Sequence, residues 1–150
     1  MIHDVRVFPL RKIIDPRGMV MHMLRRDDPH FEEFGEIYFS GVHQGARVKA
    51  WHLHHRMTLN YAVPHGLVRL VLYDQRLQSP TRGQVQEIEM GPDHYALVAI
   101  PPGIWNGFLG LAEGMSLVAN CATIPHDPNE IDRLDPFDQS IPYQWESRHP

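Results

Sequence analysis

The sequence predicts an all-β fold, either a sandwich or a barrel of about ten short strands. Apolar side chains recur in runs of five to seven residues, many of them alternating with polar ones, and turns that contain Gly, Pro or Asp separate these runs. A 3.6-residue apolar period, the mark of an amphipathic helix, is not sustained in any window. Short strands with turns between them are typical of antiparallel sandwiches and barrels.

The expected strands are rich in β-branched, aromatic or Met side chains, which suit a pleated and half-buried surface. In chain order they cover residues 5–10, 19–24, 36–42, 48–53, 59–63, 67–73, 84–90, 96–101, 105–111 and 115–121. The last 25 residues are rich in Pro and Asp and predict an irregular arm that packs back on the sheets. Residues 128–134 of this arm are expected to be helical, because Asp127 suits the N-cap and Pro128 the first helical position.

Length and composition predict one folded domain that spans residues 1–150. A hydrophobic share of 43% and a charged share of 21% are ordinary for a globular protein and argue against extended disorder. The formal net charge of -4 argues against a general nucleic-acid-binding role, which needs a surplus of Lys and Arg.

Cysteine usage and hydropathy predict a cytoplasmic protein that does not enter a membrane. The single cysteine, Cys121, permits no internal disulfide and suits a reducing compartment. No apolar run approaches the ~20 residues of a membrane helix, and the first residues do not follow the pattern of a secretory signal.

The histidine-rich stretch KAWHLHH at residues 49–55 is the most informative segment. His52 and His54 are two positions apart on an expected strand, so their side chains share one face. The spacing alone allows three interpretations. The pair can hold a metal ion, one imidazole can act as a general acid or base, or both can be polar residues on a half-exposed strand.

Five motifs occur in a fixed order along the chain. They are D-P-R-G at residues 15–18, K-A-W-H-L-H at 49–54, D-Q-R at 74–76 with S-P-T-R-G at 79–83, I-P-P-G-I-W-N-G-F at 100–108, and D-P at 135–136 before Trp145. From about Val5 to Trp145 this order resembles the dTDP-4-dehydrorhamnose 3,5-epimerase family. The resemblance implies a cupin-type double-stranded β-helix, which is a jelly-roll barrel, with the irregular, partly helical arm at its C-terminal end.

The resemblance implies an isomerase that epimerises a nucleotide-linked 4-keto-6-deoxy sugar in deoxysugar or cell-surface polysaccharide biosynthesis. A proton would leave C3, C5 or both and return from the other face. His52 matches the family's base, and Asp135 matches the carboxylate that fixes the tautomer of that imidazole and raises its pKa. No metal or organic cofactor is expected, because the C4 ketone already acidifies these protons.

The resemblance also implies the groups that bind the nucleotide-diphosphate sugar. Arg17 and Arg76 match positions that hold the diphosphate, as suits the planar fork of arginine. Lys49 stands where the family has a third arginine, and only a β-bulge would let it share a face with His52.

Three further positions are expected at the substrate. His54 replaces a glutamine of the family motif, and Asn106 replaces a histidine. Trp105 lies in a segment that borders the pocket. By contrast, Trp51 and Phe108 are expected to pack in the core.

Other positions depart from the family pattern. Ala119 stands where the family has its catalytic tyrosine, and Leu59 lies near the position of a lysine that stabilises the enolate. Another group would have to supply the proton, and Tyr38 and Tyr61 on neighbouring strands are the candidates.

Three alternatives to the epimerase remain open. The His52/His54 pair also resembles cupin-type sugar 3,4-ketoisomerases, and the loss of the tyrosine is compatible with a non-catalytic nucleotide-sugar-binding cupin. A metal enzyme would need a third ligand, but Met57 and Asn106 occupy the regions where cupins place a Glu and a His. Family members form homodimers in which a strand of one subunit extends the other's sheet, and the apolar N-terminal strands here permit that arrangement.

Overall fold

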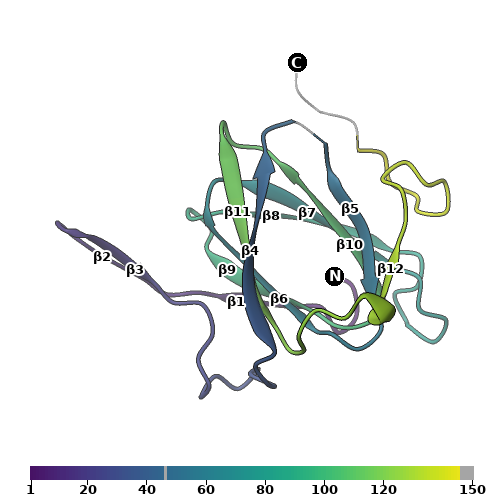
Figure 1. Cartoon of the computed structure of the whole chain (residues 1–150), viewed down its shortest axis with the longest axis horizontal. Helices are drawn as coiled ribbons and strands as arrows, with labels where there is room; N and C mark the ends of the chain where they lie inside the picture. The colour runs from purple at the N-terminus through teal and green to yellow at the C-terminus, as the bar shows by residue number, and fades with distance from the viewer. Residues whose placement is uncertain (46, 146–150) are drawn as a thin grey trace.

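The alternating apolar segments form two five-stranded antiparallel sheets that face each other (Figure 1), in a computed structural model that describes residues 1–45 and 47–145. The strands are β1 (Arg6–Pro9), β2 (Lys12–Asp15), β3 (Gly18–Met21), β4 (Glu36–His43), β5 (Lys49–His54), β6 (Leu59–His65), β7 (Val68–Asp74), β8 (Val85–Met90), β9 (Ala96–Ile100), β10 (Ile104–Gly110), β11 (Met115–Ala122) and β12 (Ile131–Arg133).

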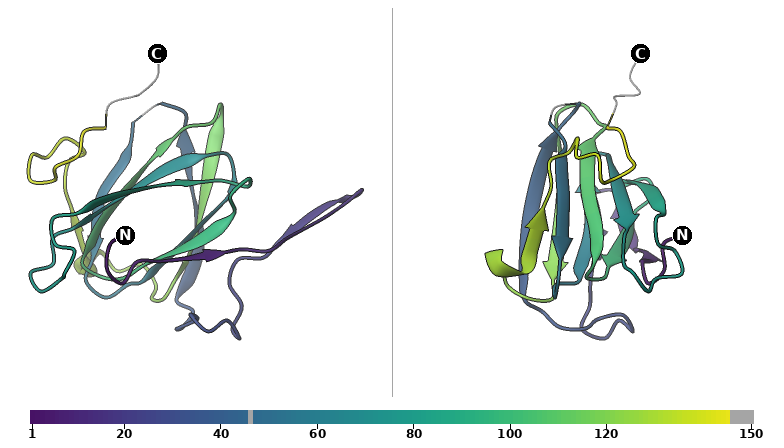
Figure 2. Two further views of the ribbon diagram at one scale, coloured as in Figure 1. Left: turned by 180° about the vertical axis from the view of Figure 1, so that it is seen from behind. Right: turned by 90° about the vertical axis from the view of Figure 1, so that its right-hand side faces the viewer.

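The strand order identifies the predicted jelly-roll. One sheet has the order β1-β9-β6-β11-β4, and the other has the order β12-β5-β10-β7-β8. The two layers lie face to face in the right-hand view of Figure 2. The β2–β3 hairpin forms a separate two-stranded sheet that projects away from both layers (Figures 1 and 2). All ten predicted strands are present, with ends shifted by a few residues.

The space between the sheets is filled by side chains from alternate positions of facing strands. Leu70 and Leu72 from β7 meet Val98 and Ile100 from β9, and all four side chains are at most 1% exposed. Complete burial of one such side chain contributes about 1.5–3 kcal/mol. This core fills the space between the sheets. It does not fill the space near β4, β5 and β12, where β4 and β12 are the edge strands of their sheets.

A second apolar cluster covers the outer face of β5 and β10. Trp51 is fully buried there, as predicted, and its ring lies 5.0 Å from that of Trp145 in the C-terminal arm. Ile141 of the arm belongs to the same cluster, and Trp51 Nε1 donates a hydrogen bond to the carbonyl of Pro136. The predicted arm therefore does pack back on the sheet.

The helix predicted for residues 128–134 is wrong beyond its first turn. The 3₁₀ helix η1 (Pro128–Glu130) contains that turn, and Asp127 caps it by accepting a hydrogen bond from Asn129 N at 2.9 Å. The next three residues form β12 instead, because the free edge of β5 offers them backbone partners. Over the described part of the chain, no helix is long and apolar enough to cross a membrane.

Candidate active site

A cavity of about 410 Å³ opens where β4 of one sheet faces β5 and β12 of the other. Its lining combines imidazoles, phenols and cations. The lining residues are Glu36, Tyr38, Ser40, Lys49, His52, His54, Met57, Tyr61, Phe108, His126, Ile131 and Arg133. Five of the residues predicted for the site are therefore together here: His52, His54, Lys49, Tyr38 and Tyr61.

A bulge in β5 turns Lys49 toward the same cavity as His52. Asn106 of β10 pairs with His52, and Phe108 pairs with Lys49, so three steps along β5 match two along β10. An extra residue in one strand reverses the alternation beyond it. The predicted need for a bulge at Lys49 is thus confirmed.

His52 is half-buried, and its ring makes no hydrogen bond to any other described residue. Burial is the main cause that lowers the pKa of His52 to about 4, and the electrostatic effects of Arg133, His54 and Lys49 act in the same direction. The imidazole is therefore neutral near pH 7, with lone-pair and N–H groups available to a ligand.

His54 is buried beside a carboxylate. Its Nδ1 is hydrogen-bonded to Oε1 of Glu130, a residue that is 3% exposed. Oε2 of Glu130 accepts the backbone N–H groups of His55, Arg56 and Met57 at 3.0–3.2 Å. Burial by itself raises the pKa of Glu130, but the hydrogen bonds from His54 and the backbone outweigh it and leave that pKa below its usual value.

Two tyrosines stand on the other sheet. Tyr38 of β4 accepts a hydrogen bond from Asn120 Nδ2 at 3.1 Å, and Tyr61 of β6 donates one to Asn106 Oδ1 at 3.3 Å. Burial raises the pKa of both phenols, that of Tyr61 most strongly. Both therefore remain protonated near neutral pH and are potential proton donors.

Asn106 connects the two walls of the cavity. Its amide donates a hydrogen bond to the carbonyl of His52 at 3.0 Å while its oxygen accepts from Tyr61. Its neighbour Trp105 points to the opposite face of β10, into the outer cluster, where Nε1 donates to Gln75 Oε1. Trp105 therefore lies outside the cavity, contrary to the expected substrate contact.

Two cations line the cavity without ionic partners among the described residues. Lys49 Nζ donates a hydrogen bond to Ser40 Oγ at 2.9 Å, and Arg133 of β12 has no ion pair within that part of the chain. Sequence reasoning missed Arg133, as well as Glu130. Arg133 lies in the edge strand β12 and Glu130 immediately precedes it, but the whole segment was assigned to a helix, which hid their place beside β5.

Asp135 is not paired with His52. Arg133 lies opposite His52, and Leu134 then exchanges backbone hydrogen bonds with Trp51, so the chain leaves the cavity before it reaches Asp135. The exposed Asp135 carboxylate accepts Phe137 N at 2.9 Å and faces a separate pocket on the other side of β5. The expected His52–Asp135 contact is therefore absent.

The two arginines expected at the diphosphate also lie elsewhere. Arg17 stands at the tip of the β2–β3 hairpin, with a 91% exposed side chain that pairs with Asp15 at 2.8 Å. Arg76 is bonded to the fully buried Asp74, to Asp4 and to the carbonyl of His3. Arg76 thus holds the chain's own turns together.

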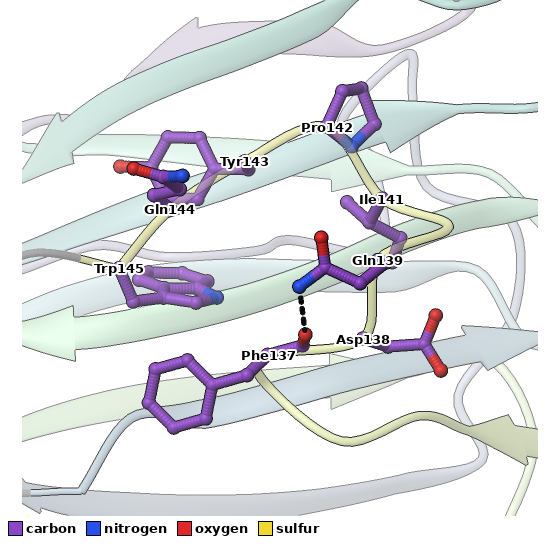
Figure 3. A pocket seen from close by; sticks show the side chains of 8 residues that line it. All are labelled: Phe137, Asp138, Gln139, Ile141, Pro142, Tyr143, Gln144 and Trp145. Atoms are coloured by element: carbon purple, nitrogen blue, oxygen red, sulfur yellow. Dashed lines mark hydrogen bonds between the residues drawn. The ribbon is translucent and has the colours of Figure 1, made fainter.

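No group of three or more His, Cys, Asp or Glu side chains in residues 1–45 and 47–145 is arranged to hold a metal ion. Figure 3 shows a further pocket, of about 520 Å³, that the C-terminal arm forms with residues 137–139 and 141–145. Its one carboxylic acid, Asp138, accepts hydrogen bonds from Ser140, and its one phenol, Tyr143, donates a hydrogen bond to Glu87. The cavity at β5 is therefore the better candidate for proton chemistry.

Comparisons with known proteins agree on one family. A family model described as dTDP-4-dehydrorhamnose 3,5-epimerase matches residues 1–149. The spore coat polysaccharide biosynthesis protein SpsL of Bacillus subtilis is 32% identical over 147 residues, 97% of this chain and 97% of SpsL. The probable low-salt glycan biosynthesis epimerase Agl13 of Haloferax volcanii is 33% identical over 144 residues, 95% of this chain and 88% of Agl13.

A solved structure gives the same result. A dTDP sugar isomerase from Desulfovibrio desulfuricans G20 has a TM-score of 0.93 and 45% sequence identity, and the match covers 96% of this chain and 92% of that one. The chain therefore belongs to the dTDP-4-dehydrorhamnose 3,5-epimerase family, and its class of enzyme is the sugar-epimerising isomerases.

Proposed function

We propose that the cavity at β5 epimerises a nucleotide-diphosphate-linked 4-keto-6-deoxy sugar at C3, C5 or both. The observation that carries this proposal is the arrangement of the two walls, since imidazoles on one sheet face protonated phenols on the other. A base on one face of a sugar ring and an acid on the opposite face suffice to invert a carbon next to a ketone.

The reaction would proceed through an enolate. A β5 imidazole removes the proton next to the C4 ketone, and the C–H electron pair moves into the enolate. Tyr38 or Tyr61 then returns a proton from the other side, which inverts the carbon. The family motif assigns the base to His52, which is neutral near pH 7, and His54 is the other imidazole on the same wall.

Lys49 and Arg133 are the groups that we propose for the diphosphate. Both line the cavity, and the one acidic side chain in the lining, Glu36, accepts the backbone N–H of His126. An anionic ligand would therefore meet two cations that make no ion pair among the described residues, in a chain whose overall charge is negative.

We also propose that two copies of the chain form a dimer, with each hairpin packed on the partner. Ile14, Met19 and Val20 of the hairpin are 56–70% exposed, and β4 has a free edge beside the exposed Ile37 and Phe39. Such a dimer would bring Arg17 of one copy toward the other copy, which would account for its distance from its own cavity. A cytoplasmic location is part of the proposal, supported by the single, unpaired cysteine.

Deuterium incorporation tests the proposed reaction. The protein is incubated in D₂O with dTDP-, CDP- or GDP-4-keto-6-deoxyglucose, and the sugar is examined by NMR. We expect deuterium at C3, C5 or both, with inverted configuration. One of the variants Tyr38→Phe and Tyr61→Phe removes the acid, and the exchange rate of that variant should fall by about 10²–10⁴-fold. Tight binding of all three compounds without exchange would instead identify a non-catalytic binding protein.

The 3,4-ketoisomerase remains a second candidate, because both His52 and His54 line the same wall. Two adjacent imidazoles could take the proton from C3 and return it to C4 on one face of the ring, while the proton of the C3 hydroxyl passes to the C4 oxygen. The same NMR experiment separates the two reactions, since an isomerase would move the ketone from C4 to C3.

A further inference from the structure

Glu130 is a buried carboxylate for which the proposed reaction has no role. It lies in η1, immediately before β12, with both oxygens engaged: Oε1 by His54 and Oε2 by the backbone of residues 55–57. A carboxylate with so many donors is fixed in position and remains ionised. Its one side-chain partner among the described residues is His54.

The contact with Glu130 sets the tautomer of His54. An ionised carboxylate only accepts hydrogen bonds, so Nδ1 of the neutral imidazole must carry the proton and Nε2 must carry the lone pair. Within residues 1–45 and 47–145, no group is hydrogen-bonded to Nε2, and the ring forms part of the cavity wall. In its neutral form, His54 therefore presents a free lone pair at Nε2 while its contact with Glu130 anchors Nδ1.

We propose that His54 is a proton-transfer residue of this cavity and that Glu130 positions it, an inference that rests on the proposed epimerase function. When the sugar's C–H bond breaks, its proton passes to Nε2 of His54 and its electron pair enters the enolate. Glu130 balances the charge of the resulting imidazolium. Exchange with solvent then removes the extra proton from His54 and returns a proton to the phenolate that has reprotonated the carbon.

The surroundings of the two imidazoles favour His54 over His52 as the group that keeps this proton. An imidazolium at His52 would face Arg133 and Lys49 without a carboxylate beside it. An imidazolium at His54 would face those more distant cations too, but Glu130 is in direct contact with it. The family motif led us to expect a carboxylate beside His52. The structure instead places a carboxylate, Glu130, beside His54, the next histidine on the same face.

The test compares His54→Gln with His55→Gln, the adjacent histidine. His55 is 54% exposed at its side chain, pairs with Asp132 at 2.9 Å and does not line the cavity, so it is a matched control. We measure deuterium exchange into the nucleotide-linked 4-keto-6-deoxyglucose that the unaltered protein turns over fastest. The proposal predicts a loss of about 10²–10⁴-fold in kcat for His54→Gln, little change in KM, and no change for His55→Gln.

Two further measurements separate catalysis from a structural role. Exchange by His54→Ala should recover when imidazole is added, which a purely structural contact to Glu130 would not produce. In the unaltered protein, ¹⁵N NMR should show the neutral His54 ring protonated at Nδ1 and not at Nε2. Glu130→Gln should lower kcat and shift its pH profile, because the amide can no longer balance the imidazolium.

The results distinguish this inference from the proposed function. If the unaltered protein exchanges no deuterium into any of the three substrates, the epimerase proposal fails and takes this one with it. If the protein is active but His54→Gln matches the His55→Gln control while His52→Gln is inactive, only the role of His54 is overturned. A neutral ring protonated at Nε2 would also overturn it, whether or not the variants fold.

Discussion

At the scale of single residues, the charge state of the cavity depends on which side chains have partners. The His52 ring has no hydrogen-bond partner among the described residues. Arg133, which the sequence did not predict at the site, lies opposite His52 on β12 and lowers its pKa. His54 has Glu130, and the two phenols have amide partners from Asn106 and Asn120. The same residue type thus has different chemistry at positions 52 and 54.

Replacing Arg133 by Gln should raise the pKa of His52. Burial is the larger cause of the depressed pKa, so the new value should stay below the ordinary 6.5. NMR titration of the His52 ring measures the shift directly. An unchanged pKa would mean that the guanidinium does not act on His52, and would weaken its proposed role beside the ligand.

The same variant has a stability consequence with a definite sign. Because His52 binds a proton less readily in the folded chain than in the unfolded one, acidification below about pH 6.5 favours unfolding. Arg133→Gln should reduce this loss of stability on acidification while leaving the pH 8 value nearly unchanged. Urea unfolding across this pH range checks both statements.

At the scale of elements, alternation predicted the strands well but did not predict their partners. The two-residue period of a strand predicted which side chains of β5 share a face. The bulge at Lys49 was predicted because alternation alone would put this lysine on the face opposite His52, whereas the family resemblance places it at the substrate. The contact between His54 and Glu130 spans 76 positions, and no local pattern encodes it. The error at Asp135 arose because a motif fixes a position in sequence, whereas the pairing of β12 with β5 fixes the position in space.

The turn of residues 74–83 shows the same limit, since Arg76 was expected at the substrate and instead bonds Asp74. Arg76→Gln should therefore lower the free energy of unfolding by about 1–3 kcal/mol, because the buried carboxylate of Asp74 loses a charged donor. KM should remain unchanged. Arg82→Gln, an exposed change in the same turn, is the control. A higher KM with an unaltered free energy of unfolding would contradict this prediction and would indicate that Arg76 binds the substrate.

At the scale of the whole molecule, the β2–β3 hairpin is difficult to explain in a single copy of the chain. Its two strands have four residues each and stand away from both sheets (Figure 1). A two-stranded hairpin alone is marginally stable in water. This hairpin also exposes apolar side chains on both faces, since Ile14 pairs with Met19 and Ile13 pairs with Val20. A partner that covers these faces would stabilise it.

We therefore expect the chain to be a dimer in solution, with a molecular mass by light scattering of about twice 17.4 kDa. Ile14→Asp combined with Val20→Asp places charge on both faces of the hairpin and should give a monomer, because charge is costly in an apolar interface. Leu77→Asp is the matched control, since Leu77 is 72% exposed in a turn away from the hairpin. A monomeric unaltered protein, or a dimer that survives the double change, would contradict the proposed interface. If the double variant is a folded monomer with a raised KM, the hairpin of one copy also contributes to substrate binding by the other.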